Sequence, residues 1–163
     1  MKISFTLLLS LFAAGLLQAQ TAKQLLDSGY VAYQNGAFDE AIEKFQASIE
    51  LDKTNAETYY LKGVCQSQIQ LNIAAIKSYE KALKLDPNYA EVHYEIGYSY
   101  FQLNKFQKAI AAFDKAIALR PNYAEAWFNR GSVKCIIGEK KAAVADWQQA
   151  EKLGASIPDL ECE

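Results

Sequence analysis

Histidine, cysteine and carboxylate side chains are the residues of this chain that could do chemistry, but their spacing does not favour it. His93 is the only histidine, and no cluster of His, Cys, Asp or Glu has the spacing of a metal site. The sequence also lacks the glycine-rich loop that binds phosphates and the nucleophile elbow of hydrolases. We therefore expect no enzymatic activity, no metal and no cofactor.

The three cysteines show no C-x-x-C spacing, which argues against redox catalysis and a zinc site. Cys135 and Cys162 could form a disulfide that closes the C-terminal end, provided that the compartment is oxidising. Two free thiols are the alternative that we favour, because nothing in the sequence sets the path of the tail and disulfide geometry is demanding. We expect Cys65 to be a small, buried and inert residue.

The first residues have the pattern of a secretory signal peptide. Lys2 precedes an uncharged run over residues 3–17, and Ala19 provides a small residue for cleavage. At 1.5 Å per residue the run spans about 22 Å, less than the roughly 30 Å of a bilayer core. We expect residues 1–19 to be removed and the mature chain, without a membrane span, to be exported to the periplasm or cell envelope, or secreted. An uncleaved anchor is the alternative.

The mature chain would be weakly acidic. Without Lys2 it has 16 basic and 19 acidic residues, a net charge of −3, and the two signs are well mixed. Nucleic-acid binders carry a basic patch or stripe instead. We therefore expect no nucleic-acid partner.

The rest of the chain repeats every 34 residues through four copies, without an insertion or deletion. Strict repetition at this period is typical of a solenoid, in which each unit buries its apolar face against its neighbours. We place the solenoid at residues 20–157, the repeats at about 22–55, 56–89, 90–123 and 124–157, and a tail at 158–163. The aligned columns are Gly29, Gly63, Gly97 and Gly131; Ala41, Ala75, Ala109 and Ala143; Phe45, Tyr79, Phe113 and Trp147.

Each copy is predicted to contain two helices. In the third copy, apolar residues at helical spacing indicate helices over 90–103 and about 106–119, with a break at Asn104. Gly36 and Gly138 take the place of Asn104 in copies one and four. Copy two has neither Gly nor Asn there, so its first helix is expected to run longer. His93 falls in a column with Leu25, Tyr59 and Trp127, which we interpret as a core position.

Three fragments carry a resemblance to a known family: Asp86-Pro87-Asn88-Tyr89-Ala90-Glu91, Arg120 to Trp127, and Ala109-Ile110 through Phe113 to Ala116. They resemble the tetratricopeptide repeat (TPR), here of an exported bacterial type, over residues 22 to about 157. The resemblance implies an all-α, right-handed solenoid of four helix-turn-helix repeats. It also implies an interaction scaffold that holds a peptide or helix of a partner protein. Self-association is a further option.

In proteins of this family the first helix of each repeat lines a concave groove. Carried over to this sequence, that groove has an aromatic floor with amide and carboxylate edges, a composition typical of binding surfaces. Two alternatives stay open: several of these aromatics only pack between repeats, or the groove carries an amphipathic small molecule. The candidate groove residues are Tyr30, Tyr33, Tyr60, Gln68, Glu91, Tyr94, Tyr98, Phe101, Glu125 and Phe128.

Family members that hold the C-terminal carboxylate of chaperones use basic and amide side chains at set groove positions. Those positions are occupied here by Leu26, Tyr30, Leu61, Glu91 and Glu95. No cation is present among them, so this activity is not expected.

Copy four alone has opposite charges at positions seven and twenty-three, which should face each other across its two antiparallel helices. The residues are Arg130 and Asp146. An arginine near the core needs an acceptor, and a carboxylate can take two of its N–H donors. We therefore predict an internal ion pair, with an Arg130 side chain that reaches into solvent as the alternative.

Overall fold

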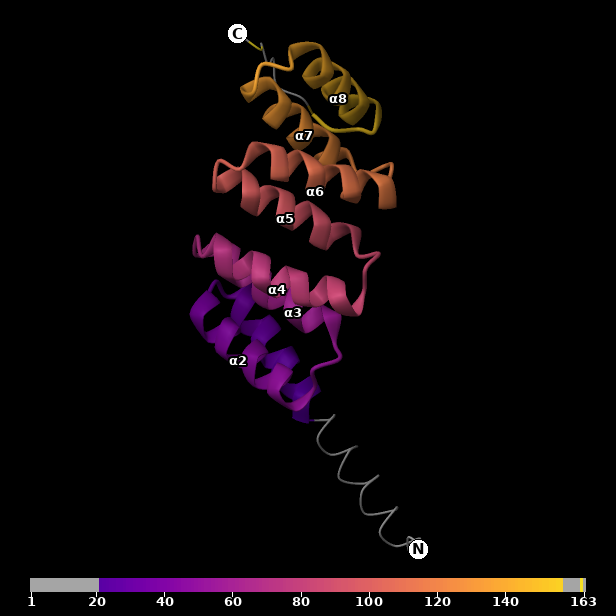
Figure 1. The fold of residues 1–163 in the computed structure, drawn as a ribbon. Helices are drawn as coiled ribbons and strands as arrows, with labels where there is room; N and C mark the ends of the chain where they lie inside the picture. The colour runs from indigo at the N-terminus through magenta and orange to yellow at the C-terminus, as the bar shows by residue number, and fades with distance from the viewer. Residues whose placement is uncertain (1–20, 157–161, 163) are drawn as a thin grey trace, which may run out of the picture.

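The computed structural model describes residues 21–156 and residue 162, and every regular element in this part is an α-helix (Figure 1). The predicted signal peptide and residues 158–161 and 163 of the predicted tail lie outside the described residues. The first described helix covers residues 21–34. The other helices are α2 (Phe38–Leu51), α3 (Ala56–Gln68), α4 (Asn72–Leu85), α5 (Ala90–Gln102), α6 (Phe106–Leu119), α7 (Ala124–Ile136) and α8 (Lys140–Lys152).

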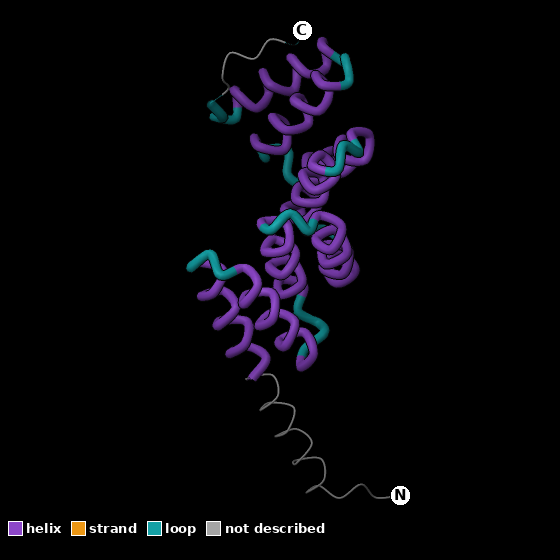
Figure 2. Tube along the Cα trace, turned by 90° about the vertical axis from the view of Figure 1, so that its left-hand side faces the viewer, coloured by secondary structure: helices purple, strands orange, loops and turns teal. Residues whose placement is uncertain are grey.

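Consecutive helices pack as hairpins, and the hairpins stack in chain order. Each of α3, α5 and α7 pairs with the helix that follows it, while α2 packs on α3, α4 on α5 and α6 on α7. Figure 2 shows the resulting elongated stack of helical pairs. The predicted all-α solenoid is confirmed. None of the described helices has the length and apolar character needed to cross a bilayer.

A glycine and an aromatic ring bring the two helices of each pair close together. The rings of Phe45, Tyr79 and Phe113 are fully buried. A Cβ built on Gly63 would lie 2.4 Å from Cε1 of Tyr79, so only glycine leaves room for this ring. Glycine inside a helix costs about 1 kcal/mol relative to alanine. The close ring packing explains why the column tolerates that cost.

The turn of copy two differs from our expectation of a longer first helix, which is wrong. Helix α3 ends at Gln68 and α4 begins at Asn72, in register with the other copies. Gln70 adopts the left-handed backbone at φ 62°, as Asn104 does at φ 56° and Gly138 at φ 84°. The stacking of neighbouring pairs requires this turn, and that requirement overrides the poor local preference of glutamine for it.

Candidate binding groove

The first helices of successive repeats lie on one side of the stack. Helix α5 contacts both α3 and α7, whereas α2, α4 and α6 make no contact with one another among the described residues. The stack is therefore tighter along α3, α5 and α7 and curves toward them, so these helices line its inner face. This arrangement is how solenoids form concave binding surfaces.

The two ends of this inner face are hollowed. A cavity of about 610 Å³ lies at the N-terminal end, with Leu26, Tyr30, Glu57 and Leu61 among its lining residues. A second cavity of about 480 Å³ at the opposite end is lined by Glu125 and Phe128 together with residues 153–156. Predicted groove residues from the first and fourth repeats therefore line real depressions.

The predicted groove residues differ in how far they reach solvent. Tyr30, Gln68, Tyr98 and Glu125 are exposed, whereas Tyr33, Tyr60, Glu91, Tyr94, Phe101 and Phe128 are half-buried. Exposure is 45% for Tyr30 and 36% for Tyr98. These two tyrosines offer the most accessible aromatic surface in the predicted set.

The half-buried tyrosines also pack between repeats. The Tyr60 ring lies 5.2 Å from that of Tyr89, and the Tyr94 ring 4.9 Å from that of Tyr123, measured between centroids. Tyr89 and Tyr123 directly precede α5 and α7, the first helices of the next repeats. The Tyr94 hydroxyl accepts a hydrogen bond of 2.7 Å from Nδ2 of Asn129 in the next repeat. Packing between repeats, one of the two alternatives left open by the sequence, therefore applies to this part of the set.

Glu95 stands out at the centre of the inner face. It is half-buried on α5, and none of the described side chains forms an ion pair or hydrogen bond with it. Burial raises the pKa of Glu95 to about 7. By contrast, Glu91, one turn earlier, pairs with Arg120, which holds the pKa of Glu91 down against the effect of burial.

The charge of Glu95 acts on tyrosines of several elements. Burial is the main cause that raises the pKa values of Tyr60, Tyr79, Tyr94 and Tyr123, and the charge of Glu95 contributes to each. The hydroxyl of Tyr79 is buried and has no hydrogen-bond partner. On sequence alone, Glu95 only argued against a carboxylate ligand, and its environment was not predicted. The aligned position holds the uncharged residues Leu61 and Asn129 in the adjacent repeats. A charged residue in this column was the signal that could have indicated an unusual site.

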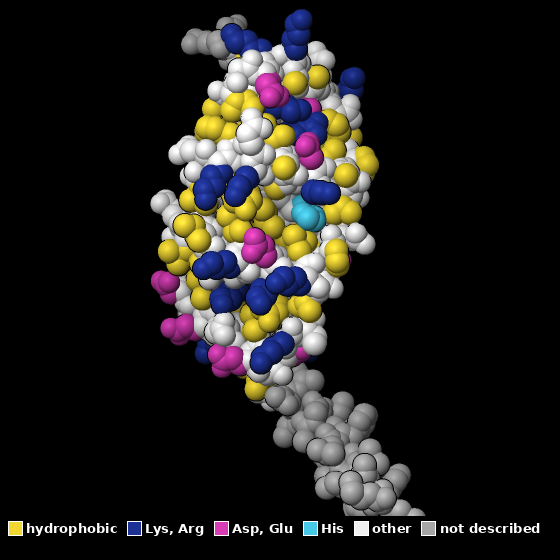
Figure 3. Space-filling model, in the orientation of Figure 1, with side chains coloured by type: hydrophobic (Ala, Val, Ile, Leu, Met, Phe, Trp, Pro, Cys, Tyr) yellow, Lys and Arg dark blue, Asp and Glu magenta, His cyan; other side chains and the backbone are white. Residues whose placement is uncertain are grey.

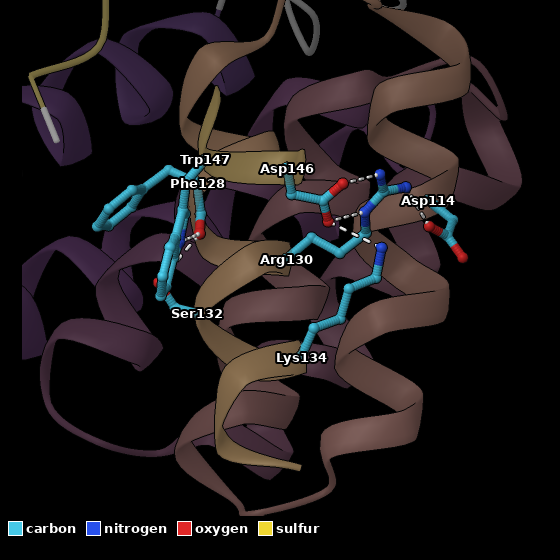
Figure 4. A network of polar contacts seen from close by, with 7 residues as sticks. All are labelled: Asp114, Phe128, Arg130, Ser132, Lys134, Asp146 and Trp147. Carbon is cyan, nitrogen blue, oxygen red and sulfur yellow. Dashed lines mark hydrogen bonds and ion pairs between the residues drawn. The ribbon is translucent and has the colours of Figure 1, made fainter. Parts of the chain in front are cut away.

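A buried polar network holds the last repeat together (Figure 4). Arg130 donates from Nε and Nη2 to the two carboxylate oxygens of Asp146, at 2.8 and 2.6 Å. Lys134 also donates to Asp146, at 2.8 Å, and Nη1 of Arg130 reaches Asp114 of the preceding repeat at 2.5 Å. Arg130 and Asp146 thus face each other, and the network adds two partners that the sequence analysis did not name.

The cysteines and His93 have separate environments. Cys135 and Cys162 are joined by a disulfide, with their Cα atoms 5.6 Å apart, where the sequence favoured free thiols. Cys65 is free and fully buried, and burial raises the pKa of its thiol to about 11. The interpretation of His93 as a core residue is wrong: its ring is half-buried, with Nε2 lying 3.3 Å from the carbonyl oxygen of Pro87 at the edge of the repeat.

The chemistry available to this surface is binding. Within the part of the chain that the structure describes, no group of His, Cys, Asp and Glu could hold a metal ion. On the face shown in Figure 3, basic and acidic side chains are interspersed with apolar ones. The inner face combines exposed aromatic rings, two depressions and Glu95, a half-buried carboxylate without an ion pair to any described side chain.

Comparison with known proteins identifies the repeat. A family model described as TPR repeat matches residues 29–69, 73–104 and 97–134. The chain belongs to the tetratricopeptide repeat family. None of the curated proteins compared with this TPR protein matches it.

Solved structures share its fold. A crystal structure of MamA is 30% identical, with 81% of this chain and 77% of that chain covered and a TM-score of 0.79. YrrB, described as a TPR protein with an unusual peptide-binding site, is 18% identical over 82% of this chain and 69% of its own, with a TM-score of 0.73. The first TPR of Spaghetti (RPAP3), bound to an HSP90 peptide, is 21% identical over 73% of this chain and 94% of its own, with a TM-score of 0.71. The last two likenesses concern the fold alone.

Proposed function

We propose that this TPR protein is an interaction scaffold that holds a peptide or helix of a partner protein along its inner face. The observation that carries the proposal is the row of aromatic side chains between two depressions, on the side where the first helices converge. Exposed aromatic side chains provide large contact area at low entropic cost, which makes them frequent anchors of interfaces. We propose no catalytic role.

The exposed tyrosines are the expected anchors. Tyr30 lies 6.1 Å from Tyr33, and Tyr98 lies 6.4 Å from Phe101, between ring centroids. Each exposed ring is thus backed by a second, half-buried ring that limits its motion. A rigid aromatic pair loses little entropy when a partner covers it.

Two fold neighbours support a peptide guest. YrrB is described as having a peptide-binding site, and the RPAP3 repeat was solved with an HSP90 peptide. These descriptions apply to YrrB and RPAP3, not to this chain. In this chain Glu91 and Glu95 occupy positions where a cation would be needed to hold a carboxylate, so a different part of the partner must be bound.

We also propose that the protein works in the periplasm or cell envelope. The pattern of residues 1–19 supports export. The Cys135–Cys162 disulfide adds support, because disulfides persist in oxidising compartments and are rare in the cytosol.

A carrier of an amphipathic small molecule is the second candidate. The cavity of about 610 Å³ near Leu26 and Leu61 falls within the usual volume range of small-molecule sites. Native mass spectrometry of protein purified from its own host distinguishes the two candidates. A stoichiometric small molecule retained in the folded protein would favour the carrier, and a ligand-free chain would favour the scaffold.

Site-specific photocrosslinking in intact cells tests the scaffold. A photoreactive residue at Tyr98 on α5 should yield a discrete adduct with a partner protein, and Tyr30→Ala should weaken that adduct. The same photoreactive residue at Lys77, exposed on α4, serves as the matched control because it lies on a second helix. Adducts from Lys77 but none from Tyr98 would contradict the proposed binding face.

A further inference from the structure

Glu95 is a half-buried carboxylate on α5, the helix of the inner face that contacts both α3 and α7, and none of the described side chains forms an ion pair or hydrogen bond with it. We propose that Glu95 and the tyrosines around it form a binding site for the cationic side chain of a lysine or arginine on the partner segment. This inference rests on the proposed function, because it names the chemistry of the segment that the inner face holds.

The tyrosines come from elements that converge on α5. Tyr60 lies on α3, Tyr79 on α4 and Tyr94 on α5, while Tyr123 precedes α7. The Tyr60 and Tyr79 ring centroids are 6.2 Å apart, and Tyr94 stacks against Tyr123 at 4.9 Å. Aromatic faces attract cations through their quadrupole, by about 0.5–2 kcal/mol depending on desolvation. The half-buried rings of Tyr60 and Tyr94 therefore favour a positive charge, whereas Tyr79 is fully buried and the Tyr123 ring already has Arg120 at 4.9 Å from its centroid.

The other carboxylates of the inner face are either paired with a cation or hydrated. Glu91 is paired with Arg120, and Glu57 and Glu125 are exposed to water. Glu95 has neither a cation nor full hydration, and an ionised carboxylate in that condition is costly. A ligand that brings a positive charge would remove this cost. The raised pKa of Glu95, about 7, agrees with that physical picture.

The site discriminates between ligand charges. An anion would meet Glu91, Glu95 and Glu125 with Arg120 as the nearby cation, and Arg120 is already engaged by Glu91. A neutral guest would leave the Glu95 carboxyl without a partner. Lysine and arginine supply N–H donors as well as charge, so they can satisfy the carboxylate.

The test uses a blocked peptide of alternating leucine and lysine, compared with peptides in which glutamine or glutamate replaces lysine. Affinities are measured by titration calorimetry against the full mature chain. Glu95→Gln keeps the shape of the side chain and removes its charge. Glu80→Gln, at an exposed position of α4, makes the same change in net charge and serves as the matched control.

We expect Glu95→Gln to weaken binding of the lysine peptide about tenfold at about pH 8, and Glu80→Gln to weaken it less than about twofold. The affinity of the unmodified chain for the lysine peptide should rise between about pH 6 and pH 8, and Glu95→Gln should remove that rise. Tyr60, Tyr79, Tyr94 and Tyr123, whose pKa values are raised mainly by burial and further by the charge of Glu95, stay neutral in this range. His93, on the same helix, is present in both chains, so the comparison cancels its effect.

Equal effects of Glu95→Gln and Glu80→Gln would overturn the cation site, as would a glutamate peptide that binds as tightly as the lysine peptide. Tyr98→Ala separates this failure from failure of the proposed function. If Tyr98→Ala weakens both the lysine and glutamine peptides while Glu95→Gln changes neither, the inner face binds peptides but Glu95 holds no cation. If Tyr98→Ala changes nothing while Glu95→Gln weakens only the lysine peptide, the cation site stands and the aromatic anchor is wrong.

Discussion

The substitution Glu95→Gln should stabilise the unliganded protein at neutral and alkaline pH. The pKa of Glu95 is about 7 in the folded state, against an ordinary value of 4.5. Each pKa unit corresponds to about 1.4 kcal/mol, so ionised Glu95 costs the folded state about 3 kcal/mol. Glutamine has nearly the same shape and no charge, which removes this cost.

The sign of the pH dependence follows from the raised pKa. Below about pH 4.5 the carboxyl is protonated in both states and carries no penalty. As the pH rises from about 4.5 to 7, the unfolded chain loses its proton before the folded chain does, and the folded state loses stability. The difference between Glu95→Gln and the unmodified chain should therefore grow over this interval and level off above it.

Urea denaturation, followed by circular dichroism at a series of pH values, measures the effect. Glu80→Gln is the control, since Glu80 is exposed on α4 and should leave the pH profile unchanged. A Glu95→Gln chain that is less stable than the unmodified chain at about pH 8, or a difference that does not vary with pH, would refute the reasoning. Either result would mean that the ionised carboxylate is well satisfied in the folded protein.

Three further predictions concern the packing of the repeats. Asp146→Ala should lower the free energy of unfolding by about 3 kcal/mol, because Arg130 keeps only the exposed Asp114 as a carboxylate partner and Lys134 loses its own. Arg130→Met in the same chain should recover part of the loss, and strictly additive urea-denaturation results would contradict the pair. Cys162→Ser should lower the free energy of unfolding by about 3.5 kcal/mol, from the chain entropy of a bridge that spans 27 residues. A reductant should abolish the difference, and three free thiols in denatured, unreduced protein would exclude the bridge. Gly97→Ala should lower the melting temperature, because the new Cβ would lie 2.6 Å from Cε1 of Phe113. Overpacking of this kind typically costs about 1–3 kcal/mol. A higher melting temperature would show that the ring moves aside freely.

The helices and their order were predictable because the evidence for them is local and repeated. Apolar spacing within about fourteen residues indicates a helix, and four aligned copies report the same pattern. The expected second helix of copy three, about 106–119, agrees with α6 at Phe106–Leu119. The turn at Gln70 was mispredicted because local propensity was weighed without the stacking of neighbouring pairs, which sets the register.

The surroundings of individual side chains depended on residues from other repeats. The sequence placed Tyr94 and Tyr98 in one candidate set, yet Tyr94 is half-buried against Tyr123 whereas Tyr98 remains exposed. The disulfide between Cys135 and Cys162 likewise depends on the path of the tail, which no periodic pattern describes.

The sequence by itself determined the fold class, the repeat length, the position of the helices and the column in which Glu95 stands. Only the tertiary structure decided that this carboxylate is half-buried, acts on the pKa values of tyrosines of α3, α4 and α5 and of Tyr123, and forms no ion pair with a described cation. The physical reason is that helix formation depends on residues a few positions apart. Desolvation and charge pairing depend on every atom nearby in space, and the solenoid brings those atoms together from adjacent repeats.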